Sequence, residues 1–141
     1  MHITLRFVGE VDARQADDVA LALEDVRVEP LQLQIQGVGQ FESGSKRGRS
    51  VWARIVTTPA LLDLQRRVER ACQRAGLAPE GRKYLPHITL ARLNAASGPA
   101  AHWLLRYQGL SLGPWVAEGF ALYRSHMLDH GARYEKMALY Q

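Results

Sequence analysis

The sequence predicts an α+β fold of two similar halves, with lobes over roughly residues 1–80 and 81–141 of a single domain. Expected strands and helices follow in nearly the same order in both halves, and consecutive strands with short connections favour antiparallel pairing. The same tetrapeptide, His-Ile-Thr-Leu, opens each half, at residues 2 and 87. A repeated order of elements behind a repeated motif indicates two lobes of similar structure.

The first half is expected to contain strands over 2–8, 31–38 and 51–56 and helices over about 13–26 and 59–75. Apolar residues alternate with glutamine in 31–38, as in a half-exposed strand. Asp12 is a suitable N-cap for the first helix, and Thr58-Pro59 give the second helix a cap followed by a first-turn proline. An exposed basic loop is expected over 39–49, with Lys46, Arg47 and Arg49.

The second half is expected to contain strands over 87–93, about 115–124 and 133–140, and a short helix over 99–107. The last two strands are joined in this interpretation by a loop that holds His126, Asp129, His130 and Gly131. Each half thus offers strands and helices that can pack as one layer on another.

The composition is ordinary for a globular protein, with 47% hydrophobic and 23% charged residues. The single cysteine, Cys72, excludes an internal disulfide and a cysteine-based zinc cluster. No apolar run is long enough to span a membrane and no signal-peptide pattern opens the chain, so a cytoplasmic protein is expected, and we expect a monomer. The net charge of +4 suits a polyanionic partner such as RNA.

The repeated motif is the most informative feature of the sequence. From composition, one chance His-x-Thr-Leu is expected on the order of 0.02 times in this chain, so two copies are improbable by accident. In a strand the side chains at i and i+2 share one face. His2 with Thr4, and His87 with Thr89, would each present an imidazole and a hydroxyl from one surface.

Two imidazoles suit phosphoryl transfer, because in-line attack needs a base on one side of phosphorus and an acid on the other. The threonine hydroxyls can donate to the non-bridging oxygens as charge builds there. A structural role is the alternative for a single motif, but two copies in matching contexts favour catalysis. His126 and His130 lie four residues apart in an expected loop, and no third ligand has suitable spacing, so no metal and no cofactor are expected.

The paired motifs resemble those of the two-histidine (2H) phosphoesterase superfamily. The flanking residues 4–10, 86–92 and 122–126 resemble its RNA 2′,3′-cyclic phosphodiesterase branch, also called the 2′-5′ RNA ligase family. The resemblance implies a bilobal α+β fold, with two antiparallel sheets flanking a central cleft and helices outside. It also implies metal-independent hydrolysis of RNA 2′,3′-cyclic phosphate ends, or of cyclic nucleotides, to a 2′-phosphate. His87 would be the base that activates water and His2 the acid.

The chain departs from the family pattern in two places. Family members carry a strand and a helix before the first motif, as His87 itself does here, whereas His2 follows only Met1. The N-terminal strand and helix therefore look missing, and an N-terminally truncated form is one interpretation. Many relatives also carry an arginine at the position of Leu85, and Lys83 could supply that charge if the strand extends back to it.

Several other side chains are candidates for substrate contacts. Arg6 has the parity of His2 and Thr4, and could bind the phosphate. Arg92 has the opposite parity to His87 and points away unless the strand bends, but the family resemblance keeps it as a candidate. Arg124, within the family-like segment 122–126, is a further phosphate-binding candidate. Two aromatic side chains could stack on a base: Phe41 and Trp52.

Two other functions remain open on sequence grounds. One is an RNA-binding module without catalysis, which turnover of a cyclic nucleotide would exclude. The other is a phosphoesterase for a small cyclic-phosphate metabolite or a 2′-5′-linked oligonucleotide. The basic segment 43–49 favours longer nucleic acid over a small metabolite.

Overall fold

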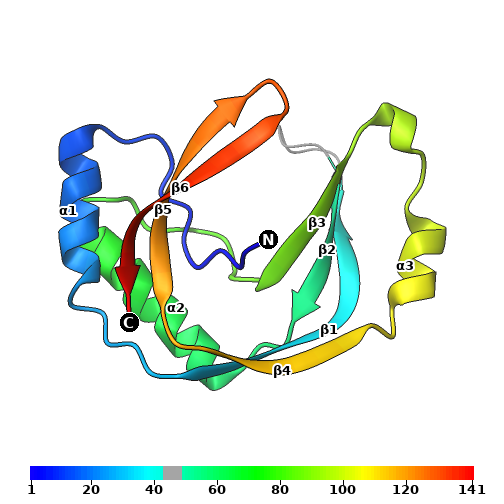
Figure 1. Cartoon of the computed structure of the whole chain (residues 1–141), viewed down its shortest axis with the longest axis horizontal. Coiled ribbons are helices and arrows are strands. Elements are labelled where there is room, and N and C mark those ends of the chain that lie inside the picture. The colour runs from blue at the N-terminus through cyan, green and yellow to red at the C-terminus, as the bar shows by residue number, and fades with distance from the viewer. Residues whose placement is uncertain (43–48) are drawn as a thin grey trace. The chain divides into compact units, whose positions relative to one another are not determined.

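The computed structural model describes residues 1–42 and 49–141, so Lys46, Arg47 and most of the expected basic loop lie outside the described residues. The elements follow in the order α1 (Ala13–Leu23), β1 (Leu31–Phe41), β2 (Arg49–Ile55), α2 (Pro59–Arg74), β3 (His87–Leu93), the 3-10 turn η1 (Ala95–Ser97), α3 (Ala101–Tyr107), β4 (Ser111–Ala117), β5 (Phe120–Leu128) and β6 (Gly131–Tyr140) (Figure 1). The predicted α+β class with antiparallel pairing is confirmed.

The chain divides into two compact units, and each draws segments from both halves of the sequence. Unit 1 comprises residues 1–5, 32–58 and 82–115, and unit 2 comprises 6–31, 59–81 and 116–141. The first motif and β3, which begins with the second motif, both belong to unit 1.

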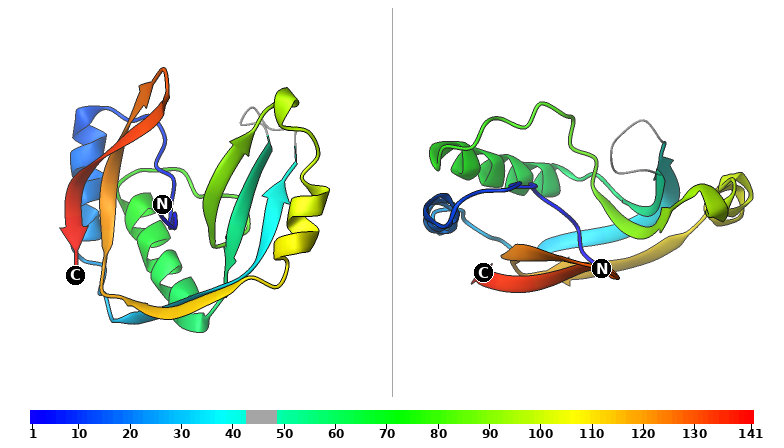
Figure 2. Two further views of the ribbon diagram at one scale, coloured as in Figure 1. Left: turned by 45° about the vertical axis from the view of Figure 1, so that its right-hand side comes forward. Right: turned by 90° about the horizontal axis from the view of Figure 1, so that it is seen from above.

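Unit 1 contains a sheet of strand order β3-β2-β1-β4, with antiparallel pairing from β1 to β2 and from β2 to β3. The short helix α3 lies alongside this sheet (Figure 2). The buried side chains of the sheet include Leu33, Val51, Ala53, Ile55 and Ile88, each at most 9% exposed. The β-branched and aliphatic side chains on one side of β2 and β3 therefore form the core that holds the motif strand in place.

Unit 2 packs α1 against α2 and contains the β5–β6 hairpin. Asp12 caps α1 as predicted, since its carboxylate accepts a hydrogen bond from the Gln15 backbone N–H at 2.7 Å. The helices bury Val19, Leu61, Val68, Ala71 and Cys72. The strand β6 is tied to α1 at its end, where the Tyr140 hydroxyl donates to the Ala20 carbonyl at 2.9 Å.

The prediction of a strand over residues 2–8 is wrong, because that segment has no regular secondary structure. A strand needs a neighbour that satisfies its backbone N–H and C=O groups. Among the described residues, the strand ladders connect members of the set β1 to β6, and residues 2–8 belong to none of these strands. Alternation of side chains alone did not suffice to form a strand there.

The predicted boundaries near the C-terminus also need correction. A single strand over 115–124 is wrong, since β4 ends at Ala117 and β5 begins at Phe120. The loop expected between the last strands is a tight turn instead, so His126 lies within β5 and pairs with Arg133. In contrast β3 has the predicted bounds, α2 ends one residue early, and β1 extends through residues expected in the basic loop. None of the described helices is long and apolar enough to cross a membrane.

Candidate active site

The first motif is irregular in backbone but attached to the segment that precedes the second motif. The Tyr84 hydroxyl donates to the backbone carbonyl of Thr4 at 3.0 Å. Burial raises the pKa of Tyr84 to about 12, so the hydroxyl keeps its proton as a donor. The N-terminus lies near the start of β3 (Figure 1). One hydrogen bond thus brings the two motif segments together, a contact that the sequence did not suggest.

His87 is the first residue of β3, and its ring orientation is set by its own backbone. Nδ1 lies 2.7 Å from the carbonyl oxygen of Leu85. A carbonyl can only accept, so Nδ1 carries a proton and the neutral ring has its lone pair on Nε2. Nε2 is therefore the atom through which His87 exchanges a proton with substrate or water.

Two aromatic rings pack around the His87 imidazole. Ring centroids lie 5.0 Å apart for Phe41 and His87, in an edge-on arrangement, and 5.7 Å apart for Trp52 and His87. Trp52 lies over Gly39, where an added Cβ would come within 2.3 Å of the indole, so only glycine fits there. Trp52 is 4% exposed and Phe41 is 39% exposed. Of the two stacking candidates, Phe41 retains surface for a base, while Trp52 supports His87.

The two motif histidines are close enough to influence each other's charge. The pKa of His2 is lowered from its ordinary value by partial burial first, then by the positive charge of the chain terminus, then by His87. A neighbouring positive charge disfavours protonation of an imidazole, which is why His87 contributes to the lowered pKa of His2.

A β-bulge decides which side chains share a face with His87. Val51 pairs with Ala91 but Trp52 pairs with Thr89, so Leu90 is the extra residue in β3. Cross-strand partners point to the same side of a sheet, and so do residues two apart on β2. We call this side, which carries His87 and Thr89, the motif face.

Two arginines lie on the motif face, and the bulge is the reason for one of them. Arg92 pairs with Ser50, two residues from Trp52, so the irregularity that the sequence argument required for Arg92 is present. Arg54 pairs directly with His87 and is exposed. Sequence reasoning missed Arg54, because only the strand register brings it beside the motif.

Arg6 forms contacts that its parity with His2 and Thr4 did not suggest. Its guanidinium group forms an ion pair with Glu69 and donates to the carbonyls of Phe7 and Ala78 within unit 2. Burial alone would raise the pKa of Glu69, but hydrogen bonds from Arg6, the Glu80 backbone and Gln73 outweigh it and lower that pKa. The Arg6 and Glu69 side chains are 8% and 15% exposed, so the pair joins the N-terminal segment to α2. The assignment of Arg6 to the phosphate stays a prediction beside this structural role.

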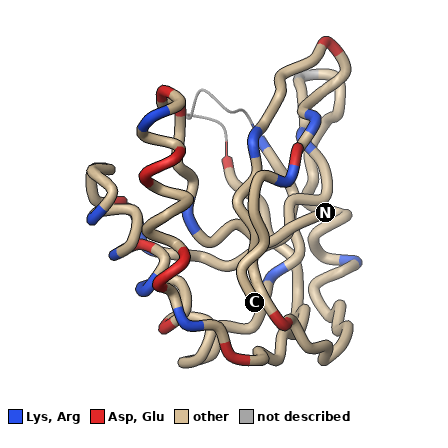
Figure 3. Tube along the Cα trace, turned by 60° about the vertical axis from the view of Figure 1, so that its left-hand side comes forward, with Lys and Arg blue, Asp and Glu red and all other residues tan. Residues whose placement is uncertain are grey.

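Neither of the two remaining cationic candidates, Lys83 and Arg124, is part of β3. Lys83 is exposed in the irregular segment before the strand, which does not extend back to it. Arg124 lies on β5 in unit 2 opposite Glu135, whose pKa is lowered chiefly by the hydrogen bond with His126. Basic and acidic positions alternate along this hairpin (Figure 3). The assignment of Arg124 to the phosphate stays a prediction.

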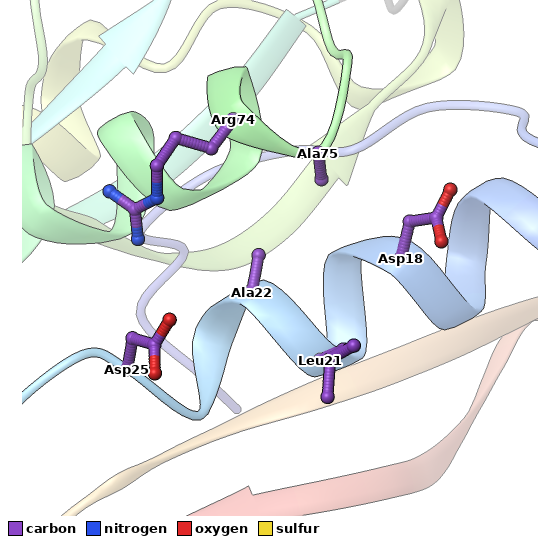
Figure 4. A pocket seen from close by; sticks show the side chains of 6 residues that line it. All are labelled: Asp18, Leu21, Ala22, Asp25, Arg74 and Ala75. Atoms are coloured by element: carbon purple, nitrogen blue, oxygen red, sulfur yellow. The ribbon is translucent and has the colours of Figure 1, made fainter.

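Unit 2 also has a groove of about 320 Å³ between α1 and the end of α2 (Figure 4). Its lining residues are Asp18, Leu21, Ala22, Asp25, Arg74 and Ala75. The lining contains two carboxylates and one guanidinium group, so the groove has no excess of positive charge for a phosphate. Among residues 1–42 and 49–141 no cluster of His, Cys, Asp and Glu is arranged to hold a metal ion.

Two relatives of known name cover nearly the whole of this chain. An Aeropyrum pernix protein named RNA 2′,3′-cyclic phosphodiesterase is 32% identical, over 96% of this chain and 78% of its own length. A Methanocaldococcus jannaschii protein of the same name is 26% identical, over 96% of this chain and 76% of its own length.

A solved structure and a family profile extend the comparison. The crystal structure of Escherichia coli LigT in apo form matches 99% of this chain and 74% of its own, with a TM-score of 0.73 and 26% identity. The profile of the 2′-5′ RNA ligase superfamily matches residues 1–127, which include both motifs and β3 with its bulge. The chain therefore belongs to the 2′-5′ RNA ligase superfamily.

Proposed function

We propose that the protein hydrolyses RNA 2′,3′-cyclic phosphate ends to 2′-phosphates, with His2 and His87 as the acid–base pair. The observation that carries the proposal is that unit 1 holds both motif histidines, close enough for His87 to lower the pKa of His2. Relatives named RNA 2′,3′-cyclic phosphodiesterase support the same reaction.

The chemistry is an in-line attack of water on phosphorus. His87 Nε2 takes a proton from the water as its oxygen bonds to phosphorus. The bond from phosphorus to the 3′ oxygen breaks, and His2 gives that oxygen a proton. The product is a 2′-phosphate monoester with a free 3′ hydroxyl, so the proton taken and the proton given balance.

The substrate's phosphoryl oxygens need donors during this step. Thr4 and Thr89 are both exposed, and Thr89 shares the motif face with His87. Their hydroxyls would donate to the non-bridging oxygens, with Arg92 as a cation on the same face. Phe41, at the edge of the His87 ring, would stack on the terminal base.

The assignment of His87 as base and His2 as acid comes from the family resemblance. A substrate with an activated leaving group needs no acid, so it should restore turnover to His2→Ala and leave His87→Ala inactive. Restoration of His87→Ala instead would reverse the two roles.

The proposal is tested by incubating the protein with 2′,3′-cyclic AMP and with an RNA that ends in a 2′,3′-cyclic phosphate. We expect 2′-phosphate products from both substrates. The variants His2→Ala and His87→Ala should give no product while remaining as well folded as the parent. A His102→Ala variant, altered at an exposed histidine of α3, should retain parent activity. Binding of the RNA without turnover would refute hydrolysis and indicate an RNA-binding module.

A further inference from the structure

The exposed face of α2 carries a row of arginines that the proposed reaction does not use. Arg66, Arg70 and Arg74 recur every four residues, so they lie on one face of the helix, and all three are exposed. At about 1.5 Å of rise per residue, the row is roughly 12 Å long. We call these three residues the arginine row.

The charge of the arginine row is not neutralised by the acidic residues of its own helix. α2 contains two acidic residues, and each forms an ion pair with another arginine: Asp63 with Arg67 and Glu69 with Arg6. Among the described residues, no ion pair includes a member of the arginine row. The exposed face of α2 therefore keeps its positive charge.

The arginine row acts against the stability of the helix. Arg70 has arginines at i−4, i−3 and i+4, and like charges at these spacings destabilise a helix. Arg74 lies in the last turn, where a cation interacts favourably with the helix dipole, but Arg66 and Arg70 lie before that turn. An arrangement that costs stability without a local gain indicates a role other than folding.

We propose that the arginine row binds the phosphate backbone of single-stranded RNA, as a second RNA contact besides the proposed active site. The choice of RNA as the polyanion rests on the proposed function. A row of this length suits a linear polyanion better than a single phosphate. α2 contains no aromatic residue that could stack on a base, so binding should depend on salt and not on the base sequence.

A membrane surface is a poorer fit for α2 than RNA. Interfacial helices insert an apolar face among the lipids. The apolar face of α2 is not available for insertion, because Leu61, Val68 and Cys72 are buried. Only the polar face is left for a partner, and contacts through arginine alone are typical of phosphate-backbone binding.

The experiment measures the binding of an oligouridine without a cyclic phosphate, as a function of salt concentration. The double variant Arg66→Gln/Arg70→Gln should weaken binding roughly 5- to 25-fold at low salt, as the loss of two exposed ion pairs does. The slope of log affinity against log salt should become shallower by about 1.4, which is two phosphate contacts at about 0.7 each. An oligoadenosine of the same length should give the same result.

The control variant Arg14→Gln/Arg106→Gln removes the same charge from exposed positions of α1 and α3 and should retain the parent affinity and salt slope. Turnover of 2′,3′-cyclic AMP should be the same in the parent and in Arg66→Gln/Arg70→Gln, because the arginine row takes no part in the reaction. If the parent binds oligouridine through the row but hydrolyses neither RNA nor cyclic AMP, the hydrolytic function fails while the RNA contact stands.

Thermal unfolding separates RNA binding from a structural role of the row. The thermal midpoint of Arg66→Gln/Arg70→Gln should rise by roughly 1–4 °C, because like charges are removed from the helix. A lower midpoint with parent-like RNA affinity would assign the row to helix stability and overturn the proposal. Loss of binding to phosphatidylserine vesicles with unchanged RNA affinity would also overturn it, and would assign the row to a membrane surface.

Discussion

At the scale of single residues, His87 is prepared for proton transfer by contacts on three sides. The Leu85 carbonyl fixes its tautomer, Phe41 and Trp52 hold the ring in place, and Arg54 lies across the strand. Positioning of this kind lowers the entropic cost of reaching the reactive geometry. The position of the His87 ring depends on the start of β3, on Gly39 and on the buried indole of Trp52, and not on the motif alone.

The threonines should act in the transition state more than in substrate binding. Thr89→Ala and Thr4→Ala remove a hydroxyl where negative charge grows on the phosphoryl oxygens. We expect kcat to fall. The activation free energy should rise by less than the roughly 2.7–4 kcal/mol that loss of a strong oxyanion donor costs. Thr89→Ser keeps the hydroxyl and should retain most of the rate. Steady-state kinetics decide, and a rise in KM alone would assign these residues to uniform binding.

The pKa of His2 should respond to His87. Because the positive charge of His87 is one cause of the lowered His2 pKa, His87→Asn should raise that pKa toward the ordinary value of 6.5. Burial and the terminal amine remain, so the pKa should not reach it. NMR titration of the His2 ring measures this shift, with His102→Asn as the control. An unchanged His2 pKa in His87→Asn would show that His87 has no electrostatic effect on His2.

The same shift has a consequence for rate. With His2 as the acid, activity needs the proton on its ring. Because the pKa of His2 is lowered, the alkaline limb of the bell-shaped pH profile should lie at a lower pH than an ordinary histidine would give. The apparent values describe the coupled pair rather than either ring.

At the scale of elements, the segment before the first helix is held by side chains instead of a strand ladder. Tyr84 attaches residues 2–5 within unit 1, and Arg6 attaches the following residues to α2 within unit 2. Tertiary hydrogen bonds of this kind replace the backbone pairing that the segment lacks.

Removal of the Tyr84 hydroxyl should therefore affect catalysis. Tyr84→Phe keeps the ring but loses the hydrogen bond to Thr4, which contributes about 1 kcal/mol. We expect kcat to fall several-fold while the thermal midpoint changes little. Tyr107→Phe, in α3, is the control. Parent-like kcat in Tyr84→Phe would show that this bond does not position the first motif.

The Arg6–Glu69 pair should be important for stability. Arg6→Met leaves a largely buried carboxylate unpaired and should lower the free energy of unfolding by about 3 kcal/mol. The double variant Arg6→Met/Glu69→Gln should recover part of the loss. Denaturant unfolding measures the stability of both variants. An unchanged midpoint in Arg6→Met would show that the ion pair makes no net contribution to stability.

The pH dependence of this pair follows from the lowered pKa of Glu69. Its stabilisation is fully present above the unfolded value, ordinarily 4.5, and is lost as pH falls through the lower folded value. The stability difference between the parent and Glu69→Gln should therefore shrink as the solution is acidified below that point.

At the scale of the whole molecule, the net charge of +4 suits an RNA partner, while the monomeric state and cytoplasmic location remain predictions. We also predict that activity needs no divalent ion, because two imidazoles, hydroxyls and arginines supply each proposed role. Turnover should be unchanged after dialysis against EDTA. Activity that is lost in EDTA and restored by a divalent ion would contradict the proposed chemistry.

The sequence by itself determined the α+β class, the family, the motif pair and the bounds of β3, and nearly those of α2. These features depend on short-range patterns: the spacing of His and Thr, a proline after a cap, and apolar positions every three or four residues. Such patterns act on neighbouring residues and do not need a partner elsewhere in the chain.

Only the tertiary structure decided the surroundings of the motifs. The alternation in residues 2–8 predicted a strand, but the segment has no regular secondary structure, and the parity of Arg6 gave no indication of its ion pair with Glu69. A bulge at Leu90 brought Arg92 onto the motif face, and register alone placed Arg54 beside His87. Each depends on which distant segment lies alongside, and a one-residue change in pairing moves a side chain to the opposite face of a sheet.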